Sequence, residues 1–205
     1  MSFEFIFQIA ILIMSIVIHE VSHGYVAYAY GDPTAKYQGR LTLNPLKHLD
    51  MMGSIVIPLI SYFFGGFIFG WAKPVPYNPY NLKAGRFPEV MVAMAGPLSN
   101  ILLALLFGFT LRFSLAGGYA NDAFVHITGI VVFVNILLAV FNLVPVPPLD
   151  GSKLLFALFP EAVYKMRYFF ERWGLFLVLI FIFFLWQFVS PLVSVLFHLI
   201  TGIAI

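Results

Sequence analysis

The sequence predicts an all-α polytopic membrane protein with about four spanning helices, one re-entrant segment and a small β-element. Composition is the first reason, because 61% of the 205 residues are hydrophobic and only 10% are charged, against about 25% charged in soluble domains. Several apolar runs also reach the roughly 20 residues that a helix needs to cross a bilayer. Finally, nearly all basic residues fall in segments that can share one side of a membrane.

The net charge and the cysteine content further limit the possible functions of the protein. The net charge is +2, without a cluster of Lys and Arg, so nothing favours a nucleic-acid partner and none is expected. The chain contains no cysteine, which excludes disulfides and thiolate catalysis. The expected environment is the lipid bilayer.

The first predicted span runs from Phe3 to about Tyr30. Gly31-Asp32-Pro33 ends it, because glycine favours a helix C-cap and proline cannot continue the helix. The apolar run lacks a basic start and a small-residue cleavage site. We therefore interpret it as a retained helix and not as a signal peptide.

Two extended segments flank an apolar segment that is poorly suited to span a membrane. Gly39–Asn44 alternates like a short strand, and prolines hold Trp71–Pro79 extended; together they predict the small β-element. Between them, Met52–Gly70 is marginal in length for a span and is interrupted by Pro58 and Gly65-Gly66. We interpret this segment as re-entrant, which is tolerated where protein or a water-filled cavity covers the broken backbone.

Three further spans are predicted, at about Pro88–Leu115, at about Ala123–Leu143, and from Trp173 to about Ile200. The mixed stretch Lys153–Arg172 predicts a short helix. The chain thus divides into a membrane core, residues 1–151, and a C-terminal part, residues 152–205, with a short cytoplasmic helix and the last span.

Within the first span, His19-Glu20-Val21-Ser22-His23 predicts a metal site. Positions four apart share one helix face, so His19 and His23 can offer two imidazole nitrogens to one zinc ion. Glu20 can then reach a water at the metal and take its proton. The alternative is a pair of core histidines hydrogen-bonded to neighbours. Buried polar groups in a membrane helix are costly unless they pair or bind something, which favours the metal.

A catalytic zinc usually has three protein ligands. The remaining candidates are His48, Asp50, Asp150 and Glu161. His48 and Asp50 lie in a polar loop, where solvation is expected. Asp150 follows three prolines at the end of a span, so its carboxylate can turn inward at the depth of His23. Its alternative role is that of a helix-capping residue.

Several amide side chains lie near these positions. Asn142 lies at the same broken helix end as Asp150 and could hold the oxyanion of a tetrahedral intermediate. Equally, it could satisfy carbonyls freed by Pro145. Asn135 could belong to the same polar patch. Asn100 could belong to it too, but it is better explained as an interhelical hydrogen-bonding residue. Gly96-Pro97 is better explained as a site of close packing and a kink.

The basic residues indicate the topology. If Met52–Gly70 re-enters, only Arg112 lies on one side, and the other side holds Lys36, Arg40, Lys47, Lys73, Lys83, Arg86, Lys153, Lys165, Arg167 and Arg172. If the segment spans, the basic residues divide between both sides and Asp150 falls away from His23. The re-entrant topology predicts a multi-pass cell-membrane protein with both ends outside. Its charged loops and active-site opening face the cytoplasm.

The sequence resembles the site-two protease family of intramembrane zinc metalloproteases, in its compact bacterial and archaeal branch. His19–His23 and Asn142–Gly151 carry the resemblance, supported by Gly39–His48, Trp71–Asn78 and Gly96–Asn100. It covers most of the chain up to Gly151 and leaves the last span unmatched. Relatives often carry a PDZ or CBS regulatory domain, which this length is not expected to hold.

The resemblance implies one Zn²⁺ per chain, held by His19, His23 and Asp150. It implies Glu20 as general base and acid, and Asn142 near the scissile carbonyl. The implied activity is that of a zinc metalloendopeptidase that cleaves membrane-spanning segments of substrate proteins, in regulated intramembrane proteolysis. Because a strand edge beside the zinc could pair extended substrate, we expect substrate to contact Gly39, Arg40, Leu41, Pro74, Val75 and Pro76.

Three other functions compete with this one. A catalytically inactive relative that binds membrane helices is disfavoured by the intact His19–His23 motif and Asp150. A metal transporter is disfavoured because the sequence has one ligand cluster and no symmetric second half. A structural scaffold leaves Glu20 unexplained. The sequence indicates neither the substrate, the cleavage sequence, the regulator nor the oligomeric state.

Overall fold

The computed structural model describes residues 3–57, 60, 63 and 72–203, and of residues 3–4, 54–55, 160–167 and 171 only the backbone. Within these residues the regular structure is helical, without a strand. The long helices are α1 (Phe3–Ala29), α4 (Arg86–Ala116), α5 (Asp122–Asn142), α7 (Pro160–Ile180) and α8 (Trp186–Thr201), and η4 (Phe181–Leu185) joins α7 to α8. The short elements are α2 (Thr34–Tyr37), η1 (Pro45–Lys47), η2 (Met52–Val56), η3 (Pro79–Asn81) and α6 (Asp150–Leu158).

Four helical stretches of the described chain are long and apolar enough to cross a membrane: Phe5–Ala29, Arg86–Ala116, Asp122–Asn142 and Arg172–Thr201. Large apolar side chains such as Leu102, Phe113 and Phe183 remain exposed on them. Exposed apolar surface of this extent is typical of contact with lipid. The prediction of an all-α membrane protein with about four spans is confirmed in these respects.

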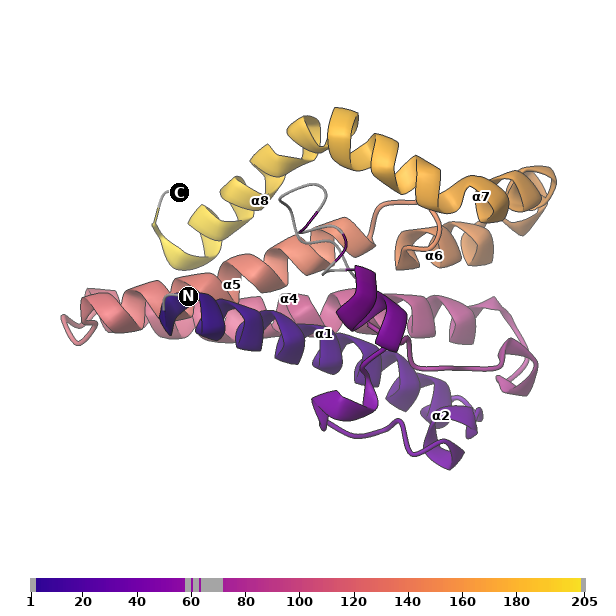
Figure 1. Cartoon of the computed structure of the whole chain (residues 1–205), viewed down its shortest axis with the longest axis horizontal. Helices are drawn as coiled ribbons and strands as arrows, with labels where there is room; N and C mark the ends of the chain where they lie inside the picture. Colours follow the sequence, from indigo (N-terminus) through magenta and orange to yellow (C-terminus); the bar gives the residue numbers. More distant parts are fainter. Residues whose placement is uncertain (1–2, 58–59, 61–62, 64–71, 204–205) are drawn as a thin grey trace.

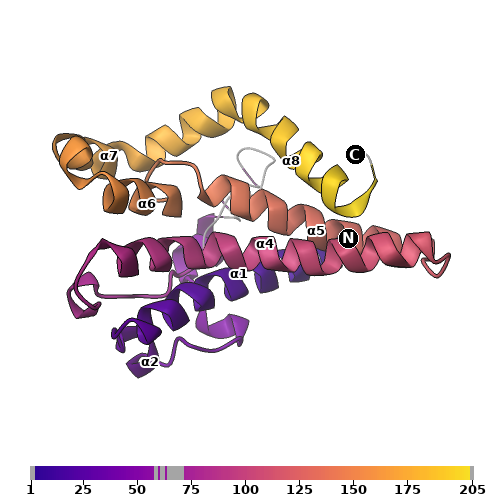
Figure 2. The same ribbon diagram turned by 180° about the vertical axis from the view of Figure 1, so that it is seen from behind.

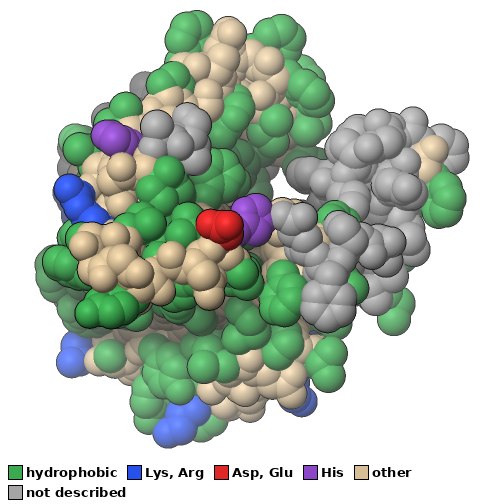
Figure 3. All heavy atoms as spheres, turned by 90° about the vertical axis from the view of Figure 1, so that its left-hand side faces the viewer, with side chains coloured by type: hydrophobic (Ala, Val, Ile, Leu, Met, Phe, Trp, Pro, Cys, Tyr) green, Lys and Arg blue, Asp and Glu red, His purple; other side chains and the backbone are tan. Residues whose placement is uncertain are grey.

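Helix α4 is central, packing against α1, α5, α6 and α8. Helices α7 and α8 form an arch whose far end returns to α4 and α5 (Figures 1 and 2). The buried core of this contact comprises Ala104, Val132, Ile136, Val193 and Phe197. Both termini lie toward one end of the molecule (Figure 1). The face at that end is dominated by hydrophobic side chains, with charged ones sparse (Figure 3).

The chain leaves α1 and returns to α4 at the same end of the bundle. The Lys83 amide donates to the Tyr30 carbonyl at 2.9 Å, and the Lys73 amide donates to the His48 carbonyl at 2.9 Å. The predicted re-entrant course of Met52–Gly70 lies mostly outside the described residues. Its two flanks, however, meet side by side.

The predicted β-element is wrong for the described residues. Its two segments do lie together, but the Arg40 side chain joins them by donating to the carbonyls of Lys73 (2.6 Å) and Pro74 (3.2 Å). Pro74 and Pro76 have no amide hydrogen, and the Val75 amide donates to a side chain of α1. A strand ladder needs repeated main-chain donors and acceptors. Here the donors are missing or already engaged.

Candidate metal centre and active site

Helix α1 places two of the predicted ligands one turn apart on one face. His19 and His23 are both buried, at 5% and 6% exposure. Their Nε2 atoms lie 3.2 Å apart, and the rings meet edge to face with centroids 4.8 Å apart. The spacing of four residues accounts for this placement, because it returns the side chain to the same face after one turn.

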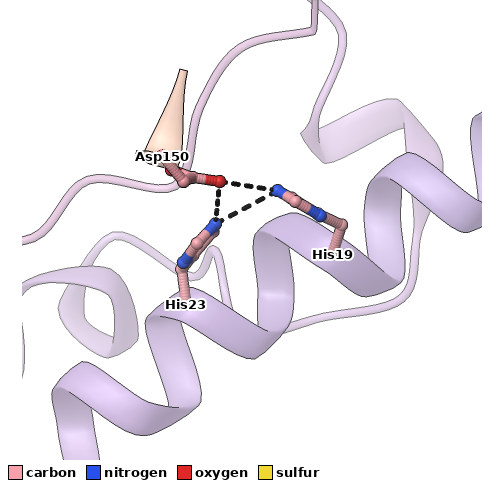
Figure 4. Close-up of side chains that lie close together, drawn as sticks. All are labelled: His19, His23 and Asp150. Atoms are coloured by element: carbon pink, nitrogen blue, oxygen red, sulfur yellow. Dashed lines mark hydrogen bonds and ion pairs between the residues drawn. The ribbon is translucent and has the colours of Figure 1, made fainter. Parts of the chain in front are cut away.

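Asp150 comes to the same point from the first residue of α6. Its Oδ2 lies 3.0 Å from Nε2 of His19 and 3.0 Å from Nε2 of His23 (Figure 4). The loop before it folds tightly onto the end of α5. A Cβ on Gly151 would overlap the Leu143 carbonyl, so the turn that delivers Asp150 needs glycine at the next position.

The other candidate ligands lie elsewhere. His48 is buried, and its Nε2–H donates to the Thr42 carbonyl at 2.8 Å. Asp50 accepts from the Gly53 amide at the start of η2. The side chain of Glu161 is outside the described part. Among described residues, the two α1 histidines and the α6 aspartate are the group of potential ligands whose donor atoms all lie within 4.8 Å of one another.

Each histidine is oriented by a second hydrogen bond. Nδ1–H of His19 donates to Oδ1 of Asn100 at 2.5 Å, and Nδ1–H of His23 donates to the Val92 carbonyl at 2.6 Å. Both partners are oxygens that only accept, so Nδ1 must carry the proton in each ring. In neutral imidazoles this leaves both Nε2 atoms with a lone pair directed at the site.

The three site atoms are therefore all acceptors. The Nε2 atoms of His19 and His23 and Oδ2 of Asp150 lie within 3.2 Å of one another. Their lone pairs repel one another unless a cation or an extra proton lies between them. Bonds of 2.0–2.1 Å in tetrahedral geometry predict separations of about 3.3 Å, close to those observed. Two histidines and one carboxylate are also a donor set found in catalytic zinc sites. The residues present thus fit zinc.

Gly96 on α4 faces these atoms at close range. A Cβ at this position of α4 would overlap Nε2 of both His19 and His23. Because glycine has no side chain, α4 can pass close to the ligands without filling the site. Close packing was the predicted role of Gly96-Pro97, and the partner in that packing is the pair of histidines.

A buried amide network lies behind His19. Asn100 donates from Nδ2 to Oδ1 of Asn135 at 2.7 Å, and Asn135 donates to Oγ of Ser15 at 3.0 Å. The amides are fully buried, and Ser15 is 4% exposed. Sequence reasoning assigned Asn100 to interhelical bonding without connecting it to His19, and it missed Ser15. The available signal for Ser15 was its position one turn before His19.

Glu20 is half-buried, and its Oε2 accepts from the Val75 amide at 2.7 Å. Nearby, Lys153 donates to Oδ1 of Asp150 at 2.9 Å, leaving the other carboxylate oxygen toward the histidines. Burial opposes the Lys153 charge, but attraction to Asp150, the hydrogen bond to it, and attraction to Tyr77 and Glu20 raise its pKa. Lys153 therefore remains positively charged beside the carboxylates of Asp150 and Glu20.

Asn142 is the last residue of α5 and is half-buried. Its Nδ2 donates to the Leu138 carbonyl at 2.9 Å, one turn earlier in the same helix. Of the predicted substrate-contacting residues, Arg40 and Val75 are buried, Leu41 and Pro76 are half-buried, and Gly39 and Pro74 are exposed.

Comparison with known proteins gives the family. The model of "Peptidase family M50" matches residues 114–185. The Bacillus subtilis protein "Putative zinc metalloprotease YwhC" is 43% identical over 189 residues, which are 89% of this chain and 80% of that protein. The chain belongs to peptidase family M50. The predicted resemblance to site-two proteases is thereby confirmed.

Two relatives of lower sequence identity have similar names. "Putative zinc metalloprotease Rip2" of Mycolicibacterium smegmatis is 34% identical over 151 residues, 72% of this chain and 55% of that protein. "Putative zinc metalloprotease MJ0611" of Methanocaldococcus jannaschii is 31% identical over 162 residues, 73% of this chain and 72% of that protein. No solved structure matches the chain. With four apolar helices long enough to span, the chain is a multi-pass membrane protein of family M50.

Proposed function

We propose that this chain is a zinc-dependent intramembrane endopeptidase. Each relative named above has the name "Putative zinc metalloprotease", which supports both the reaction class and the metal. One observation carries the proposal: Nε2 of His19, Nε2 of His23 and Oδ2 of Asp150 converge, buried, with both Nδ1 protons directed away. We assign one zinc per chain to these three atoms.

When bound, zinc would polarise the substrate carbonyl and lower the pKa of an attacking water. Glu20 is the general base that takes the proton from this water and the acid that returns it to the leaving amine. Its place beside His19 on α1, and its position near the Lys153 charge, support this role. Asn142 is proposed to hold the oxyanion, for which its amide must leave the Leu138 carbonyl.

The proposed substrate is a membrane-spanning segment of another protein. The site residues lie among helices apolar enough to span a bilayer, so a substrate held in the same bilayer can approach laterally. A helical peptide bond is protected by its own hydrogen bonds. The substrate must therefore unwind before attack, and the segment around Arg40, residues 39–41, is its proposed contact.

The proposed orientation places the charged loops and the active-site opening in the cytoplasm. The two flanks of the 58–71 stretch meet through the Lys73–His48 hydrogen bond, which supports a course that enters and leaves on one side. The Arg112 guanidinium donates to the Leu199 carbonyl near the C-terminus, toward the end where the termini lie. This supports both chain ends outside.

The decisive experiment compares the wild type with Glu20→Gln, and with Glu89→Gln as a control on the exposed first turn of α4. Each protein is purified in detergent, its zinc is measured, and cleavage of a synthetic single-span peptide is followed with and without a chelator. We expect one zinc in all three, and cleavage only by the wild type and Glu89→Gln. Glu20→Gln should retain less than about 1% of the activity.

These measurements, together with zinc flux into reconstituted vesicles, separate the alternatives. Zinc without cleavage by the wild type would identify an inactive relative, and a wild type without zinc would indicate a scaffold. Zinc flux into reconstituted vesicles without cleavage would indicate a transporter. Each of these outcomes, like activity above a few per cent in Glu20→Gln, would refute the proposed mechanism.

A further inference from the structure

We infer that the segment 73–78, which we name the strap, is a positioning element for Glu20. The strap crosses α1 beside the metal centre, where the sequence predicted a substrate-pairing edge. Its contacts assign it a different role, namely to hold the Glu20 carboxylate in place. This inference rests on the proposed function, because it concerns the base of that reaction.

The central contact is one hydrogen bond. The Val75 amide donates to Oε2 of Glu20 at 2.7 Å. On either side, Pro74 and Pro76 have no amide hydrogen, so Val75 carries the only main-chain donor in this part of the strap. A main-chain donor to a charged carboxylate is among the stronger hydrogen bonds in proteins. It removes rotational freedom from a long side chain that would otherwise occupy several rotamers.

Both ends of the strap are fixed by buried charged side chains. Arg40, 6% exposed, donates to the carbonyls of Lys73 at 2.6 Å and Pro74 at 3.2 Å. Asp32, fully buried, accepts from the Asn78 amide at 2.6 Å. The donor of Val75 is thus held between two anchored points. A strap fixed in this way can define the position of the group that it contacts.

The strap also needs a notch in α1. Gly24 lies one turn after Glu20, on the same helix face. A Cβ at Gly24 would lie 2.7 Å from Cγ1 of Val75 and 2.6 Å from Cδ2 of Leu41. Both distances are shorter than packed carbon atoms tolerate, so glycine at this position lets Val75 lie where its amide reaches Glu20.

Amide hydrogen exchange tests the contact without relying on activity. The purified protein in detergent micelles is exchanged into D₂O, and the deuterium uptake of peptides spanning 73–77 is measured. Loss of the hydrogen bond in Glu20→Ala should accelerate Val75 exchange about 10- to 100-fold, whereas Glu89→Ala should leave it unchanged. Equal exchange in the wild type and Glu20→Ala would overturn the inference.

Turnover tests the consequence. Val75→Pro removes the amide hydrogen, whereas Val75→Ala keeps it and shortens the side chain. With the single-span peptide as substrate, we expect Val75→Pro to lower kcat about 10- to 100-fold, with KM within about threefold and zinc retained. Val75→Ala should keep at least about tenfold more turnover than Val75→Pro. Equal losses in both variants, or a loss expressed in KM alone, would assign the strap to substrate binding instead.

A rescue experiment covers the case in which Val75→Pro does not fold. Gly24→Ala should displace the strap and lower kcat with zinc retained. Adding Val75→Ala and Leu41→Ala removes both atoms that the new methyl group would overlap, Cγ1 of Val75 and Cδ2 of Leu41, so the triple variant should recover at least part of the turnover. Failure of this recovery in a folded, zinc-loaded triple variant would count against the notch. If the wild type cleaves nothing, the proposed function fails, while the exchange measurement still decides the Glu20–Val75 contact.

Discussion

Oδ1 of Asn100 lies 2.5 Å from Nδ1 of His19, although the residues are 81 positions apart on different helices. This contact fixes which imidazole nitrogen carries the proton and turns the other toward the metal centre. Asn100 is itself held by Asn135. The ligand geometry of α1 therefore depends on α4 and α5.

We expect Asn100→Leu to weaken zinc binding about 10- to 100-fold, because His19 loses the acceptor that fixes its tautomer and ring orientation. Competition with a chelator of known affinity measures this. Thr110→Val is the matched control: its hydroxyl donates to the Leu106 carbonyl within α4, on an exposed face. Wild-type zinc affinity in Asn100→Leu would show that His19 does not need Asn100 for its orientation.

Gly96→Ala should lower zinc content to less than about a tenth, because its methyl group would overlap Nε2 of His19 and His23 and a packed interior resists the required shift. Gly129→Ala is the control. There the nearest atom to a new Cβ is Cζ of Phe197 at 3.9 Å, an ordinary contact. Metal analysis of both purified variants gives the result, and normal zinc in Gly96→Ala would contradict the described approach of α4.

Asp150→Ala should lose zinc, whereas His48→Ala should keep it. Asp150 contacts both α1 histidines, while Nε2–H of His48 donates a hydrogen bond to the Thr42 carbonyl. His48→Ala should instead lower stability by about 1–3 kcal/mol, because it leaves a buried carbonyl without its donor. Metal analysis and thermal unfolding of the two variants distinguish these effects. Zinc loss confined to His48→Ala would reverse the assignment.

The topology is testable because the chain contains no cysteine. Single cysteines at Lys47, Lys83 and Asn121, all exposed, can be labelled with an impermeant thiol reagent in right-side-out and inverted vesicles. We expect Lys47→Cys and Lys83→Cys to react from the cytoplasmic side and Asn121→Cys from the other. Labelling of the first two from opposite sides would exclude a re-entrant course for the segment between them.

Asp32 should make the end of the strap sensitive to acid. Burial tends to raise its pKa, but hydrogen bonds from the Thr34 hydroxyl, Asn81 and the Asn78 and Thr34 amides outweigh this and lower it. A lowered folded-state pKa contributes stability above the ordinary value near 4 and loses it as pH falls through the folded-state value. Asp32→Asn should therefore be less stable than the wild type at pH 7, and the difference should shrink below about pH 4. A difference independent of pH in thermal unfolding would refute this role.

Local properties of the chain were predictable from sequence. Length and hydropathy determined the four long apolar helices, because a bilayer requires about 20 residues of apolar helix. Helical periodicity determined that His19 and His23 share a face. The prolines and glycine around Asp150 indicated a broken helix end from which a carboxylate could turn inward.

Tertiary structure decided which groups meet across the sequence. Local periodicity does not encode that Asn100 and Val92 receive the histidine protons, or that Gly96 passes beside the ligands, since these contacts depend on how α1, α4 and α5 pack. The β-element failed for a related reason. Alternating polarity predicted strands, but a ladder requires main-chain donors in register. In the folded chain, Arg40 donates to the Lys73 carbonyl and the Val75 amide donates to Glu20.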